Sequence, residues 1–144
     1  MKHPNSIGWG IVGCGWVARD YVAPAIQASH NGQLVALCDV DPRALAAIEA
    51  ADTSLRRTTT LDEFVQTPGL QAVYVATPNA HHARLMEALA AAGLPVLCEK
   101  PLARTAAEAA GMVAAAEAAG TLLATAFDQR FHQAHVRLRE LVQA

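Results

Sequence analysis

Runs that favour β-strands alternate with runs that favour helices along the whole of this 144-residue chain. Such alternation is typical of a parallel sheet covered by helices on both faces. Because crossover connections between parallel strands are right-handed, few topologies remain. We therefore predict an α/β fold with a doubly wound parallel sheet of about six strands in the order 3-2-1-4-5-6. The expected strands are 7–12, 33–38, 56–59, 71–76, 94–98 and 121–126, and the expected helices are 16–30 (interrupted near Pro24), 42–51, 61–66, 80–92, 105–119 and 132–143.

Composition and charge exclude several classes of function. The chain is 53% hydrophobic and 17% charged, which fits one globular domain. A formal net charge of −2 provides no basic field for nucleic acid or an acidic membrane surface. No stretch approaches the roughly 18 to 20 apolar residues of a membrane span, and the N-terminus has no secretory apolar run. We therefore expect a cytoplasmic protein that binds neither nucleic acid nor membranes.

The three cysteines are widely separated and form no Cys-x-x-Cys pair. This pattern favours buried, reduced thiols over disulfides or a structural zinc site. We expect no metal site in the chain.

The turn after the first expected strand carries the pattern G-x-G-x-x-A at Gly13, Gly15 and Ala18. In a dinucleotide site the first glycine permits the sharp turn, and the second lets the backbone approach a pyrophosphate. The small third residue lets helix and strand pack closely. Free amides and the dipole at the helix start then favour an anion. The same three residues also suit an ordinary tight turn, so this motif alone leaves both readings open.

Asp39 ends the second expected strand, where a carboxylate can accept hydrogen bonds from an adenosine ribose. Its charge repels a 2'-phosphate and so favours NAD over NADP, although Arg43 follows closely and can neutralise a phosphate. Asp39 can instead cap the helix that begins near Pro42, but Asp41 is better placed for that cap.

Polar clusters follow the fourth and fifth expected strands, namely Thr77-Pro78-Asn79 and Glu99-Lys100-Pro101. Because the carboxyl ends of parallel strands share one edge, we expect both clusters to lie beside the glycine turn. A lysine ammonium next to a reacting carbinol can hold its oxygen and stabilise developing alkoxide charge. The alternative is that Lys100 is a surface lysine paired with Glu99.

The motifs G-C-G-W-V-A, C-D-V-D, T-P-N-x-x-H and C-E-K-P-L cover essentially the whole chain in this order. They resemble the N-terminal half of the Gfo/Idh/MocA family, the NAD(P)-dependent sugar and polyol oxidoreductases. The resemblance implies a Rossmann domain and hydride transfer between a nicotinamide and a sugar, a polyol or a related carbinol or carbonyl substrate. The alternative is a non-catalytic dinucleotide-binding module that acts with a partner.

The resemblance also implies roles for individual residues. It puts the pyrophosphate on the glycine turn, the adenosine ribose on Asp39 and the nicotinamide beside 76–79, with Lys100 as the catalytic residue. The segment 127–131 resembles the family's N-x-R-F segment, with Asp128 or Gln129 in place of the asparagine, depending on alignment. The implied cofactor-binding residues are Gly13, Cys14, Gly15, Trp16, Val17, Ala18, Asp39, Ala76, Thr77, Pro78, Asn79, His82, Glu99 and Lys100.

The resemblance further implies a two-part organisation. Residues 1–126 are expected to form the dinucleotide-binding domain, and 127–144 a connecting segment and helix toward a C-terminal substrate domain that this sequence lacks. We expect this chain alone to bind NAD with little turnover. Apolar residues of the last helix predict a homo-oligomer, and they are Val136, Leu138, Leu141 and Val142.

Overall fold

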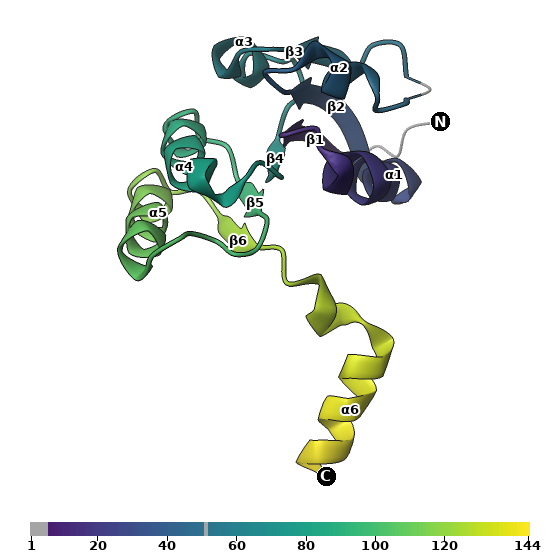
Figure 1. The fold of residues 1–144 in the computed structure, drawn as a ribbon, viewed down its shortest axis with the longest axis vertical. Coiled ribbons are helices and arrows are strands. Elements are labelled where there is room, and N and C mark those ends of the chain that lie inside the picture. The colour runs from purple at the N-terminus through teal and green to yellow at the C-terminus, as the bar shows by residue number, and fades with distance from the viewer. Residues whose placement is uncertain (1–5, 51) are drawn as a thin grey trace.

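The computed structural model describes residues 6–50 and 52–144 and contains a six-stranded parallel sheet (Figure 1). The strand order is β3-β2-β1-β4-β5-β6, which confirms the predicted doubly wound topology. The strands are β1 (Ile7–Val12), β2 (Gly32–Cys38), β3 (Arg56–Thr58), β4 (Ala72–Val75), β5 (Val96–Cys98) and β6 (Leu123–Thr125).

Helices cover both faces of the sheet. The α-helices are α1 (Ala23–Ala28), α2 (Pro42–Ala46), α3 (Leu61–Val65), α4 (His82–Ala91), α5 (Ala106–Ala118) and α6 (Gln133–Gln143). A π turn, η1 (Ala18–Val22), precedes α1, and two 3₁₀ turns, η2 (Asn79–His81) and η3 (Asp128–Phe131), precede α4 and α6. One apolar cluster joins α1 and α2 to the sheet through Ile11, Leu34 and Leu37, and a second joins α3, α4 and α5 through Phe64, Met86 and Met112.

The expected interruption of the first helix takes the form of the π turn η1. Helical structure runs from residue 16 to 28, and Ala23 N donates to Ala18 O, five residues earlier. In a regular α-helix the ring of Pro24 would crowd the carbonyl of the preceding turn. The wider π turn relieves this crowding without breaking the helix.

Helix α2 is shorter than the sequence predicted. It ends at Ala46, so the prediction of helix up to residue 50 is wrong, and residue 51 lies outside the described residues. The guanidinium of Arg57 on β3 donates to Leu45 O at 3.2 Å and to Ile48 O at 2.9 Å. Because a side chain from the next strand satisfies these carbonyls, they need no further helical amides.

Helix α6 extends away from the sheet beyond β6 (Figure 1). None of its residues is buried, and Leu138 and Leu141 each expose 60% of their surface. Among the described residues, none of the helices is both long and apolar enough to cross a membrane.

Candidate functional site

The two glycines of the turn between β1 and the first helix differ in their backbone conformation and in the space around them. Gly13 has a φ of +89°, and a Cβ there would lie 2.6 Å from Thr77 N, so a side chain is excluded. Gly15 has no positive φ, and a Cβ there would meet nothing within 4 Å. Neither the backbone conformation nor a neighbouring atom of the chain therefore requires a glycine at position 15. The open space beside it would let a ligand approach the backbone closely.

The helix that follows the turn begins at residue 16, and its first amides have no partners within the helix. Ala18 is completely buried in the apolar cluster under α1. A larger side chain there would push the helix away from the strand. The turn thus has the open backbone, free amides and close helix packing that anion binding requires.

Asp39 connects the end of β2 to the glycine turn. Its Oδ2 accepts from Cys14 N at 2.7 Å, and its Oδ1 accepts from Asp41 N at 2.9 Å. Asp41, in contrast, caps α2 by accepting from Arg43 N at 2.9 Å. The residue that caps α2 is therefore Asp41, and the carboxylate of Asp39 lies against the glycine turn.

Arg43 is held by Asp41 at the start of α2. Its Nη2 lies 2.9 Å from Asp41 Oδ2, and the hydrogen bond to the guanidinium lowers the pKa of Asp41. The positive charge closest in sequence to Asp39 is thus already engaged by a carboxylate.

The ends of β1, β4 and β5 meet at one edge, as the sequence predicted. Ala76 N donates to Val12 O at 2.8 Å, and Glu99 N donates to Val75 O at 2.9 Å. The hydroxyl of Thr77 is buried at this edge and has no hydrogen-bond partner among the described residues. A buried hydroxyl without a partner is costly, and a ligand hydrogen bond would remove that cost.

His82 is 1% exposed and lies behind this edge. Its Nε2 is 2.9 Å from Thr77 O, and its Nδ1 is 3.1 Å from Leu102 O. A neutral ring donates to one of these carbonyls, whereas a protonated ring donates to both. The histidine thus ties together the segments that follow β4 and β5, and both its nitrogens face the chain itself.

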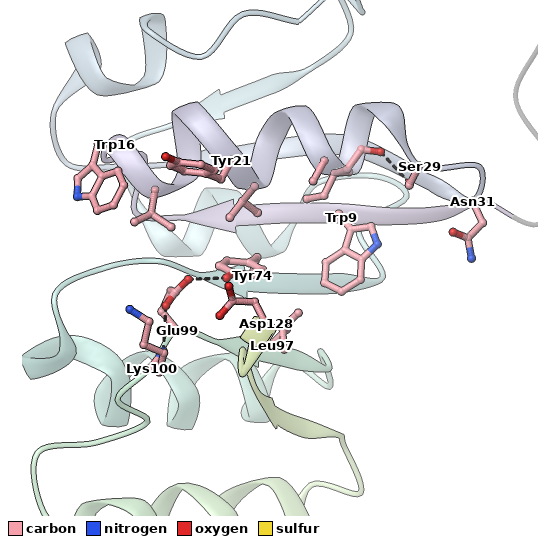
Figure 2. Close-up of a pocket in the computed structure, with 14 residues that line it drawn as sticks. Trp9, Trp16, Tyr21, Ser29, Asn31, Tyr74, Leu97, Glu99, Lys100 and Asp128 are labelled. Atoms are coloured by element: carbon pink, nitrogen blue, oxygen red, sulfur yellow. Dashed lines mark hydrogen bonds between the residues drawn. The ribbon is translucent and has the colours of Figure 1, made fainter. Parts of the chain in front are cut away.

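Glu99 and Lys100 follow β5 at the same edge. Glu99 Oε1 accepts from the Tyr74 hydroxyl at 2.7 Å, and Oε2 accepts from the backbone N of Lys100 at 3.0 Å (Figure 2). Within residues 6–50 and 52–144 the ammonium of Lys100 has no ion pair. The alternative in which Lys100 is simply paired with Glu99 is therefore not what the structure contains.

A hollow of about 620 Å³ lies between the first helix and strands β1, β4 and β5. Its floor and walls are largely apolar, and Glu99, Lys100 and Asp128 line its polar part (Figure 2). Trp16 and Tyr21 pack edge to face on one wall, with ring centroids 5.8 Å apart. Of Asp128 and Gln129, the two alternatives that the sequence left open at this segment, Asp128 lines the hollow.

Sequence reasoning missed Tyr74, Tyr21 and Trp9 as lining residues of this hollow. Tyr74 stands within a strand of small and aliphatic residues, and its position just before the strand end was the available signal. Trp16 and Tyr21, five residues apart, meet at the start of the π turn; Pro24 indicated an interruption of this helix but not its π geometry.

The cysteines are free and buried, as expected. Burial raises the pKa of the Cys14 and Cys98 thiols to about 12. Both thiols therefore stay protonated near neutral pH and are poor nucleophiles and ligands. The described part of the chain contains no group of three or more His, Cys, Asp or Glu side chains that could hold a metal ion.

Residues 7–127 match the GFO_IDH_MocA family, described as an oxidoreductase family with an NAD-binding Rossmann fold. A 1,5-anhydro-D-fructose reductase from Ensifer adhaerens is 37% identical over 134 residues, which are 93% of this chain and 40% of the relative. An inositol 2-dehydrogenase from Saccharopolyspora erythraea is 37% identical over 139 residues, 94% of this chain and 41% of the relative. A D-xylose 1-dehydrogenase (NADP(+)) from Haloferax volcanii is 35% identical over 134 residues, 93% of this chain and 41% of the relative.

A solved structure of GenD2 from gentamicin A biosynthesis, in complex with NAD, superposes with a TM-score of 0.87 and 33% identity. The match covers 95% of this chain and 39% of GenD2. The chain thus spans about two fifths of the length of the proteins that it matches.

Proposed function

The chain belongs to the GFO_IDH_MocA oxidoreductase family and contains its NAD(P)-binding Rossmann domain, and on this premise we propose that it is the cofactor-binding part of a dehydrogenase or reductase. Its substrate is a sugar, a polyol or a related carbinol or carbonyl compound. Relatives named as an anhydrofructose reductase, an inositol dehydrogenase and a xylose dehydrogenase support this substrate class. The single observation that carries cofactor binding is the open space over Gly15, at the start of the first helix.

The residues at the sheet edge fit a dinucleotide. Residues 13–17 would hold the pyrophosphate, and the buried hydroxyl of Thr77 would gain a partner when 76–79 contact the nicotinamide side. Each carboxylate oxygen can accept more than one hydrogen bond. Asp39 can therefore accept from a ribose hydroxyl while it keeps its bonds to the amides of Cys14 and Asp41.

Lys100 is the catalytic residue in this proposal. When bound, the nicotinamide supplies or accepts the hydride. The free ammonium of Lys100 donates a hydrogen bond to the substrate oxygen and stabilises the negative charge that develops on it. The apolar walls of the neighbouring hollow would displace part of the water around a bound substrate and so strengthen this interaction.

NAD is the preferred cofactor in this proposal. The carboxylate of Asp39 would repel a 2'-phosphate, and Arg43 is held by Asp41 and is less available to neutralise it. One relative is named for NADP(+) and a similar solved structure holds NAD, so these similarities favour neither cofactor. The preference for NAD rests on Asp39 and Arg43 of this chain.

The proposal extends to organisation and location. Residues 1–126 form the cofactor domain, and residues 127–144 lead toward a substrate domain. The relatives are long enough to contain such a domain, since the match covers only 40% and 41% of their length. The chain by itself then binds cofactor with little turnover. The alternative, a non-catalytic module that acts with a partner, would behave in the same way when tested alone. The exposed apolar residues of α6 support a homo-oligomer, and the three free cysteines suit the reducing cytoplasm.

Gly15→Val tests the proposal directly. Because a Cβ at Gly15 meets no atom of the chain, the variant should fold normally, while the new side chain occupies the space for the pyrophosphate. We expect NADH affinity, measured by fluorescence titration, to fall at least about tenfold, a loss of roughly 1.4 kcal/mol. Gly111→Val is the matched control, since that glycine is also unhindered but lies in α5. Equal NADH affinity in the two folded variants would contradict the proposed site.

A further inference from the structure

The hydroxyl of Tyr74 contacts Glu99 from the neighbouring strand. On β4 Tyr74 lies opposite Leu97 of β5, so Glu99 is its diagonal neighbour two positions further along. Diagonal neighbours on one face of a sheet are within reach of an aromatic side chain. The Tyr74 hydroxyl donates to Glu99 Oε1 at 2.7 Å, and only 9% of the tyrosine is exposed (Figure 2).

Two hydrogen bonds, one to each carboxylate oxygen, hold Glu99 in one orientation. Oε1 accepts from Tyr74, and Oε2 accepts from the backbone N of Lys100. Burial, together with the hydrogen bond to Glu99, raises the pKa of Tyr74. The phenol therefore stays protonated and remains a donor to the carboxylate.

Glu99 and Lys100 would otherwise be natural partners. They are adjacent in the chain, carry opposite charges and both line the polar part of the hollow. An ion pair at such a site is favourable by Coulomb attraction. It would also occupy the ammonium that the proposed reaction requires to be free.

We propose that Tyr74 is a positioning residue that holds Glu99 through its hydroxyl and thereby keeps the Lys100 ammonium free for the nicotinamide ribose or the substrate oxygen. The value of a free ammonium rests on the proposed function, but the arrangement itself is a property of this chain. In this role Tyr74 acts through Glu99, to which its hydroxyl is bonded.

The test measures how readily Lys100 reacts with an amine-selective N-hydroxysuccinimide ester at one fixed pH. Mass spectrometry of the Lys100 peptide gives the rate, and Lys2, the other lysine of the chain, is the internal reference. Tyr74→Phe removes only the hydroxyl. We expect Glu99 to turn to Lys100 and the acylation of Lys100 to slow about two- to fivefold, the range of a partly exposed ion pair.

Two further variants separate positioning from a structural effect. Adding Glu99→Gln to Tyr74→Phe removes the competing charge and should restore the rate. Tyr21→Phe is the matched control, because Tyr21 lines the same hollow but has no hydrogen bond to Glu99 among those of the described residues, and its rate should equal that of the unmodified chain.

Unchanged acylation in Tyr74→Phe, or slow acylation that Glu99→Gln does not restore, would overturn the inference. If Tyr74→Phe fails to fold, Glu99→Gln alone tests whether Glu99 is held away from Lys100. The acylation rate of Lys100 should then equal that of the unmodified chain. Faster acylation would mean that Glu99 already pairs with Lys100 and would overturn the inference. Acylation is measured without cofactor. Failure of NADH binding in the same samples would therefore refute the proposed function and leave the Tyr74 arrangement standing.

Discussion

Asp39→Ser should shift cofactor preference from NADH toward NADPH. In the unmodified chain we expect NADH to bind more tightly, because the Asp39 carboxylate lies against the glycine turn, where the adenosine ribose would meet it. Serine removes the repulsion toward a 2'-phosphate and weakens the hydrogen bonding to the ribose. Both effects act in the same direction.

The size of the shift follows from the contacts of Asp39. A hydrogen bond to a charged group contributes about 1.5–3 kcal/mol, so loss of the ribose bond and of the repulsion should change the NADH-to-NADPH affinity ratio about 10- to 100-fold. The carboxylate also accepts from Cys14 N and Asp41 N. Because a serine hydroxyl replaces these bonds only in part, the free energy of unfolding should fall by roughly 1–3 kcal/mol.

Fluorescence titration with both cofactors measures the ratio, and urea unfolding checks that the variant is folded. Asp62→Ser on the exposed start of α3 makes the same change in net charge away from the glycine turn, so it should leave the ratio unchanged. Equal affinity of the unmodified chain for the two cofactors would refute the reasoning. So would an unchanged ratio in folded Asp39→Ser.

Two further predictions concern stability and assembly. Burial raises the pKa of the Cys14 and Cys98 thiols from 9.0 to about 12, so the stability that they contribute is complete below about pH 9 and is lost as the pH rises toward 12. Urea unfolding should show this decline, with a shallower decline in Cys98→Ala, and a flat profile would contradict it. Leu138→Glu with Leu141→Glu should abolish self-association in light scattering, whereas Gln143→Glu should not, and an unmodified chain that stays monomeric at high concentration would refute the proposed oligomer.

The sheet could be predicted because strands of a parallel sheet are buried on both faces and therefore carry continuous apolar runs. The bounds of β1 match the prediction. The strand order could be predicted because right-handed crossovers leave few topologies for such a sheet. The length of α2 could not be predicted in this way. Arg57 ends that helix from a neighbouring strand, and such a contact depends on tertiary structure.

The same distinction applies to the site. The meeting of Gly13, Thr77 and Glu99 at one edge followed from the rule that parallel strands end together. The hydrogen bond from Tyr74 to Glu99 did not follow, because it depends on the register of β4 against β5. A strand that is apolar on both faces has no alternating pattern to fix its register, so the register depends on packing across the sheet.

The central claim is that the glycine turn and the adjoining strand ends hold a dinucleotide. A crystal structure of this chain with NADH bound tests it most directly. The account predicts the pyrophosphate over Gly15, the adenosine ribose on Asp39 and the nicotinamide side next to the Thr77 hydroxyl, which then has a hydrogen-bond partner. NADH bound elsewhere, with the space over Gly15 empty and the Thr77 hydroxyl still without a partner, would contradict it.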